Sequence, residues 1–168
     1  MVTRRALLAV CAVAIAVTAL KLAVPSDERR IRRIFDRAAE LLGKSGAEPV
    51  FTAAAKARDL AALIASGARF SIPERNIDVS LGGGELARQI ALARSQAQFI
   101  KVAFEGMAID FIDEDTAIVS ADILFSGTSD LMGFSGRDTR ELTATMKRGA
   151  SSGKWQFAAV RLKPVIEK

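Results

Sequence analysis

The spacing of apolar residues changes once along this chain, near residue 100, and this change constrains the fold more than any motif. Before it, apolar residues recur every three or four positions, which predicts helices over about 27–42, 49–64 and 85–98, with short strands over 69–72 and 76–81. After it they alternate with polar residues, which predicts strands over 101–112, 116–126, 139–148 and 155–163. Helices grouped before strands are typical of the α+β class, so we expect three helices packed on a curved, mainly antiparallel sheet.

The first long strand has an interruption in its alternation at Gly106. Val102 and Phe104 stand at even positions, which share one face of a strand, whereas Met107 and Ile109 stand at odd positions, which share the other. A glycine at such a change of phase is typical of a β-bulge or a bend. We therefore expect the strand to continue past Gly106 with a bulge or a bend at this residue.

An apolar segment precedes the domain. Arg4 and Arg5 are followed by residues 6–20, which carry no charge, and then by Lys21. As helices, residues 6–20 would reach about 22 Å and residues 6–24 about 28 Å, against a hydrocarbon core of ~30 Å. The length suits either a signal anchor or a cleaved signal peptide.

We therefore divide the chain into residues 1–25, a signal anchor or signal peptide that forms an apolar helix, and residues 26–168, the α+β domain. We expect a single-pass membrane protein held through residues 6–24, with its domain outside the cytoplasm, in the periplasm. The alternative is a domain secreted after signal cleavage.

Composition excludes several functions. The chain has 24 basic and 19 acidic residues, but three of the basic ones lie in the first 25, which leaves the domain near neutrality. We therefore expect no nucleic-acid partner. The chain has no histidine and no tyrosine, so the commonest general base and the commonest transition-metal ligand are missing. We expect no metal and no cofactor.

The order of elements carries a resemblance to a known superfamily. The opening helix at 31–35, the third helix before Phe104, the strand start at 115–119 and the final strand at 154–157 together resemble the NTF2-like superfamily, which includes SnoaL-like and ketosteroid-isomerase-like proteins. The resemblance implies a cone with an apolar pocket between sheet and helices, and a possible homodimer through the sheet. Isomerases and cyclases of this superfamily use Asp, Tyr or His in the pocket, and this chain has neither Tyr nor His.

Three groups of residues are candidates for a site. Asp110 and Asp122 are mid-strand carboxylates and weak catalytic candidates; their parity places them on the outer face of the sheet, with Arg140 and Arg161 as possible cross-strand partners. Leu131, Met132 and Phe134 form an apolar loop suited to meeting a membrane, a partner or a pocket. Candidates for lining a ligand pocket or filling the core are Phe104, Phe125, Met146 and Trp155.

The sequence favours a non-enzymatic, membrane-tethered NTF2-like domain that binds a protein partner or a small apolar ligand in the cell envelope. The alternative is a small SnoaL-like or ketosteroid-isomerase-like enzyme that uses a pocket aspartate.

Overall fold

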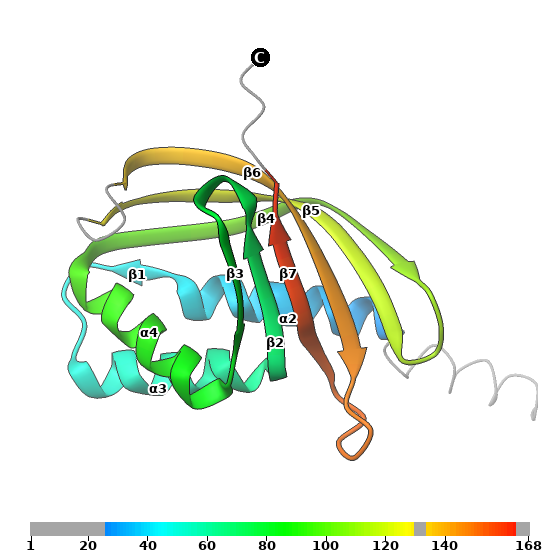
Figure 1. The fold of residues 1–168 in the computed structure, drawn as a ribbon. Coiled ribbons are helices and arrows are strands. Elements are labelled where there is room, and N and C mark those ends of the chain that lie inside the picture. Colours follow the sequence, from blue (N-terminus) through cyan, green and yellow to red (C-terminus); the bar gives the residue numbers. More distant parts are fainter. Residues whose placement is uncertain (1–25, 130–133, 164–168) are drawn as a thin grey trace, which may run out of the picture. The chain divides into compact units, whose positions relative to one another are not determined.

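The computed structural model describes residues 26–129 and 134–163 (Figure 1). The chain comprises two units, Met1–Arg30 and Ile31–Lys168. Residues 26–30 of the first unit begin helix α2 (Asp27–Leu42). None of the described helices is long and apolar enough to cross a membrane, and the apolar segment 6–24 lies outside the described residues.

Seven strands of the described chain form one sheet, in the order β1-β4-β5-β6-β7-β2-β3. Neighbouring strands are antiparallel except β2 and β7, which are parallel. The predicted α+β class, with helices preceding most of a mainly antiparallel sheet, is confirmed (Figure 1). The strands are β1 (Lys44–Ser45), β2 (Ile64–Ile72), β3 (Ile77–Leu81), β4 (Ala97–Phe111), β5 (Thr116–Ser129), β6 (Phe134–Arg148) and β7 (Trp155–Leu162). The helices after α2 are α3 (Val50–Ala62), the 3-10 helix η1 (Pro73–Arg75) and α4 (Gly83–Gln96).

Strand β2 begins earlier than the sequence predicted. The second helix was expected to reach residue 64, but it ends at Ala62 and β2 starts at Ile64. Gly67 has φ +73° and lies where the register between β2 and β7 shifts. A glycine in the left-handed region inside a strand is the usual geometry of a bulge, so Gly67 bends a strand rather than ending a helix.

The bulge predicted at Gly106 is confirmed. Gly106 has φ +61°, and the register between β4 and β5 shifts between Glu105 and Ala108. As a result Phe104 and Met107, on opposite sides of the shift, both pack against the core. A strict alternation would have turned one of them to the outer face.

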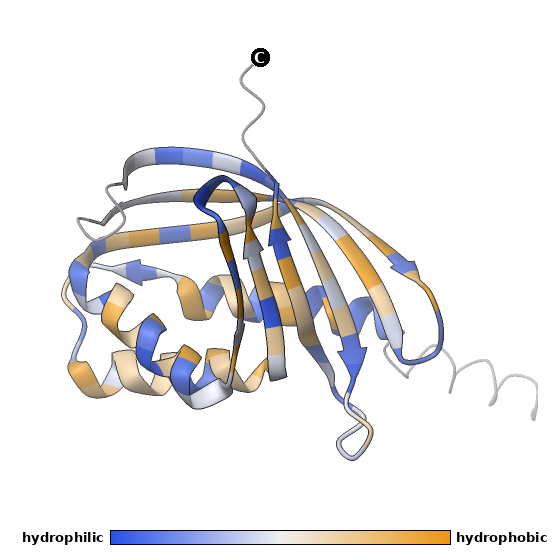
Figure 2. Ribbon diagram, viewed as in Figure 1, coloured by the Kyte–Doolittle hydropathy of each residue, from blue (hydrophilic) through white to orange (hydrophobic). Residues whose placement is uncertain are grey.

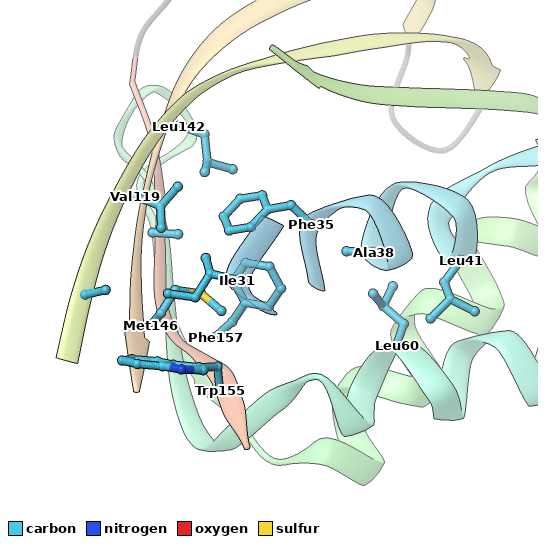
Figure 3. Packing of buried hydrophobic residues seen from close by; sticks show 12 residues of the cluster. Ile31, Phe35, Ala38, Leu41, Leu60, Val119, Leu142, Met146, Trp155 and Phe157 are labelled. Atoms are coloured by element: carbon cyan, nitrogen blue, oxygen red, sulfur yellow. The ribbon is translucent and has the colours of Figure 1, made fainter. Parts of the chain in front are cut away.

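The hydrophobic core lies between α2 and the inner face of the sheet (Figure 3). Phe35 of α2 is fully buried, with its ring edge-on to Phe104 at 5.0 Å and to Phe157 at 4.9 Å between centroids. Burying a Phe side chain contributes about 1.5–3 kcal/mol, and aromatic pairs of this geometry about 0.5–1.5 kcal/mol each. The core therefore fixes α2 over strands β4 and β7.

Helix α4 is attached to the end of α2 by one buried cation. Arg94 is 2% exposed. Its guanidinium donates hydrogen bonds to the carbonyl oxygens of Leu41 (2.6 Å), Leu42 (2.8 Å) and Gly43 (3.1 Å), and to the carboxylate of Glu48 at 2.8–3.1 Å. The carbonyls of a final helical turn have no intrahelical partner, so Arg94 satisfies them from another helix. This network holds α4 in the place where it forms one wall of a pocket.

Candidate functional site

A pocket of about 870 Å³ lies between α4, the β2–η1–β3 segment and the inner face of β5, β6 and β7. Its lining is part apolar and part polar, and the exposed polar residues form its rim. The apolar lining residues are Ile72, Ile77, Leu92, Ala93, Ile123, Phe125 and Leu162. The polar ones are Arg75, Glu85, Arg88, Gln89, Asp138 and Arg140.

The alternation of the strands determines which residues reach this pocket. On β5, Ile123 and Phe125 share the parity of the buried residues Ala117, Val119 and Ala121, so they continue the inner face beyond the core. The same alternation of hydrophobic and hydrophilic residues is visible along β3, which contributes Ile77 (Figure 2). The pocket is thus the part of the inner face that α2 leaves uncovered.

Helix α4 contributes a separate face. Glu85, Arg88, Gln89 and Leu92 are spaced at three and four residues, so they lie on one side of the helix. Leu92 is 54% exposed although it is a large aliphatic residue. Glu85 accepts hydrogen bonds from Arg88 at 2.5 Å and from Gln89 at 3.3 Å, so the polar groups of this face are engaged with one another.

A charged network joins the rim to the sheet. Arg140 donates from Nε to Asp138 Oδ2 and from Nη1 to Glu74 Oε2, both at 2.6 Å. The bond to Asp138 is the main reason that the pKa of Arg140 lies above its ordinary value. Because Glu74 belongs to η1 and Arg140 to β6, the pair ties the β2–β3 connection to β6.

Arg75 differs from the other charged lining residues. Among the residues that the structure describes, it has no hydrogen-bond or ion-pair partner, whereas Glu85, Arg88, Asp138 and Arg140 each have one. Arg75 ends η1, immediately before Asn76.

The structure distributes the predicted pocket residues between two places. Phe125 lines the pocket. Met146 and Trp155 lie in the core cluster, 0% and 3% exposed, and Phe104 packs against that cluster. Trp155 also meets the ring of Phe111, with 6.0 Å between centroids.

The other predicted candidates lie away from this pocket or outside the described residues. Asp110 and Asp122 are exposed and do not line it. Arg140 is not their cross-strand partner, because Asp122 is paired with Glu141 and Arg140 shares the inner parity of the buried Leu142. Leu131 and Met132 lie outside the described residues, as does the side chain of Phe134, the residue at which β6 begins.

Sequence reasoning missed Asp138, because the predicted strand began at residue 139, whereas β6 begins at Phe134. Asp138 lies two residues before Arg140 and four before the buried Leu142, and even spacing along a strand places side chains on the same face. This spacing could have placed Asp138 on the inner face of the sheet. Arg75 and Glu74 lay in the connection between the two short predicted strands. Within the described chain, no group of three or more acidic or thiol side chains is placed to hold a metal ion.

Helices over a curved, mainly antiparallel sheet, with a pocket on its inner face, define the NTF2-like fold found in scytalone dehydratase-like and SnoaL-like proteins. A protein from Novosphingobium aromaticivorans provisionally named scytalone dehydratase superimposes with a TM-score of 0.66 at 18% identity, over 83% of this chain and 85% of that one. Aln2 from a Streptomyces species superimposes with a TM-score of 0.60 at 17% identity, over 83% of this chain and 91% of that one. A protein from Xanthomonas campestris is provisionally named a calcium/calmodulin-dependent protein kinase II association domain. It superimposes with a TM-score of 0.61 at 15% identity, over 83% of this chain and 89% of that one. These TM-scores show a shared fold. No model of a protein family and no curated protein matches the chain.

Proposed function

We propose that this domain binds a small, mainly apolar molecule in the pocket under α4. The observation that carries the proposal is the uncovered apolar part of the lining, where Leu92 is 54% exposed and Ile123 and Phe125 are only half-buried. The volume of about 870 Å³ falls within the range of about 300–1,000 Å³ that is usual for small-molecule sites. A ligand that removed this surface from water would gain about 25 cal/mol per Å² of apolar area.

Binding without chemistry is favoured by the state of the polar rim. Arg140 is hydrogen-bonded to Asp138 and Glu74, and Glu85 accepts from Arg88 and Gln89. Groups engaged in this way shape and orient a wall. The names of similar structures favour neither binding nor catalysis, since one is provisionally named as an enzyme and another as an association domain.

The test uses the full chain and pyrenebutanol, a neutral apolar fluorophore. We expect saturable binding that Leu92→Arg abolishes, because a charged side chain would then occupy the pocket. The matched control is Ile112→Arg, which places the same charge on an aliphatic residue that is 62% exposed and lies outside the pocket. Equal binding by the wild type and by both variants would contradict the proposal.

A second candidate, a SnoaL-like or ketosteroid-isomerase-like enzyme, is favoured by one observation: Asp138 is a carboxylate on the pocket wall. Its test starts from the small molecules extracted from the purified full chain. Conversion of an extracted compound by the wild type but not by Asp138→Asn, measured by mass spectrometry, would support an enzyme. An unchanged compound would count against it.

We also propose that residues 6–24 hold the chain in a membrane with the domain outside the cytoplasm. The support is the uncharged run after Arg4 and Arg5. Alkaline phosphatase fused after residue 168 should be active, and intact-mass measurement of the native protein should show that the first 25 residues are retained. An inactive but stable fusion would reverse the orientation.

A further inference from the structure

The segment that carries Arg75 is held in place on both sides. Pro73 begins η1, and the backbone N–H of Asn76 donates to the Pro73 carbonyl at 3.0 Å. Asn76 has φ +51°, the left-handed conformation that Asn tolerates at such turns. Glu74, in the middle of η1, is bonded to Arg140 on β6. The backbone of Arg75 is therefore fixed at the rim, while its side chain is free to meet a ligand.

The charges of the lining do not balance. Arg75, Arg88 and Arg140 are cationic, and Glu85 and Asp138 are anionic, so the lining carries one excess positive charge. Glu85 is engaged by Arg88, and Asp138 by Arg140. Within the described part of the chain, the guanidinium of Arg75 is the lining charge left without a partner. Glu74, the nearest acid in sequence, is directed to Arg140 instead.

We infer that the ligand of this pocket is an apolar acid, whose anionic group pairs with Arg75 while its apolar body lies on Ile123 and Phe125. This inference rests on the proposed function. A guanidinium binds a carboxylate through two parallel hydrogen bonds, which fixes orientation as well as charge. A cationic ligand is disfavoured because the two carboxylates of the lining already accept hydrogen bonds from arginines.

The experiment compares two probes that differ only in the head group, pyrenebutyrate and pyrenebutanol. Both are titrated into the full chain and followed by fluorescence. We expect the wild type to bind the acid about fivefold more tightly than the alcohol, the scale of a partly exposed ion pair. Arg75→Gln should lower the affinity for the acid to about that for the alcohol. Arg58→Gln, at an exposed arginine of α3 outside the pocket, should retain the preference.

The outcomes separate this inference from the function on which it rests. Equal affinity for acid and alcohol in the wild type, or a preference that survives Arg75→Gln, overturns the role of Arg75 while pocket binding stands. Failure of both probes to bind overturns both proposals. A preference that weakens with added salt supports the ion pair, since salt screens exposed charges.

Discussion

Arg94 caps the C-terminus of α2, and Lys44, which follows α2, caps the C-terminus of α4, the helix that carries Arg94. The Arg94 guanidinium, from α4, donates to the last carbonyls of α2, and Lys44, which follows α2, donates from Nζ to the carbonyl oxygens of Arg94 (2.7 Å) and Ala97 (2.5 Å) at the end of α4. Positive charges at helix C-termini are favourable, and here both lie in partly or fully buried positions. The two helix ends are therefore interdependent.

Replacing Arg94 with Met should destabilise the domain by about 3–5 kcal/mol, because it leaves three carbonyls without their side-chain donor and Glu48 with Lys56 as its remaining cation. Urea denaturation of the full chain measures the loss. Arg58→Met is the control, since Arg58 is exposed on a neighbouring helix, and should change stability by less than about 0.5 kcal/mol. A loss below about 1 kcal/mol in Arg94→Met would show that the network contributes little.

Acidification should weaken the same network. Burial acts to raise the pKa of Glu48, but hydrogen bonds from Lys56 and Arg94 outweigh it and hold the pKa below the ordinary value of 4.5. A carboxylate with a lowered pKa in the folded state contributes stability above its unfolded pKa and loses it as the pH falls through the folded one. The stability difference between wild type and Glu48→Gln should therefore be largest near neutral pH and shrink below about pH 4.5. A constant difference would contradict the lowered pKa.

Substitution of Phe35 should show how much the core depends on α2. Phe35→Ala removes a fully buried ring and its two aromatic contacts, and should cost about 3–5 kcal/mol. Phe51→Ala removes the same atoms from a side chain that is 91% exposed and should change stability by less than about 0.5 kcal/mol. Similar losses measured by denaturation of the two variants would show that this burial pattern is wrong.

The contrast between Phe35 and Arg94 shows which parts of the fold are readable from sequence. Phe35 stands in a run of apolar residues with helical spacing, and this local pattern predicts its burial. Arg94 lies on α4 among small residues, where an arginine normally faces water. It is buried only because the end of α2 lies against it, and no local pattern encodes that contact. Asp138 and Arg140 were readable by parity, but the pocket that they border depends on where α4 lies.

The same limit applies to the predicted pocket residues. Phe125 and Met146 both lie on the inner face of the sheet, but Phe125 lines the pocket and Met146 lies in the core. Whether an inner-face residue lines a pocket or fills the core is decided by helix coverage: α2 covers Met146 and leaves Phe125 uncovered. Coverage is set by tertiary packing rather than by the strand itself.

Two glycine-to-alanine substitutions should change the stability of the domain in opposite directions. Gly106→Ala has room for the new methyl group, whose nearest neighbour is Asp122 Oδ2 at 3.8 Å, but φ is +61°, so it should destabilise by about 1–2 kcal/mol. Gly84→Ala lies in the first turn of α4 with open space around it and no positive φ, and should stabilise by about 0.4–1 kcal/mol. Thermal unfolding of both variants measures the signs. A stabilising Gly106→Ala would rule out backbone strain at the bulge.

Breaking the Glu74–Arg140 pair should loosen one wall of the pocket more than the domain as a whole. Both side chains are partly exposed, so Glu74→Gln should lower global stability by less than about 1 kcal/mol. Since Glu74 is the described link between η1 and β6, amide hydrogen exchange in residues 69–81 should become faster while exchange in 117–121 stays unchanged. Glu141→Gln is the control, because it breaks an exposed pair with Lys163 outside the pocket and should leave both segments as they are. Unchanged exchange in 69–81 would mean that η1, which carries Arg75, is held in place without the Glu74–Arg140 ion pair.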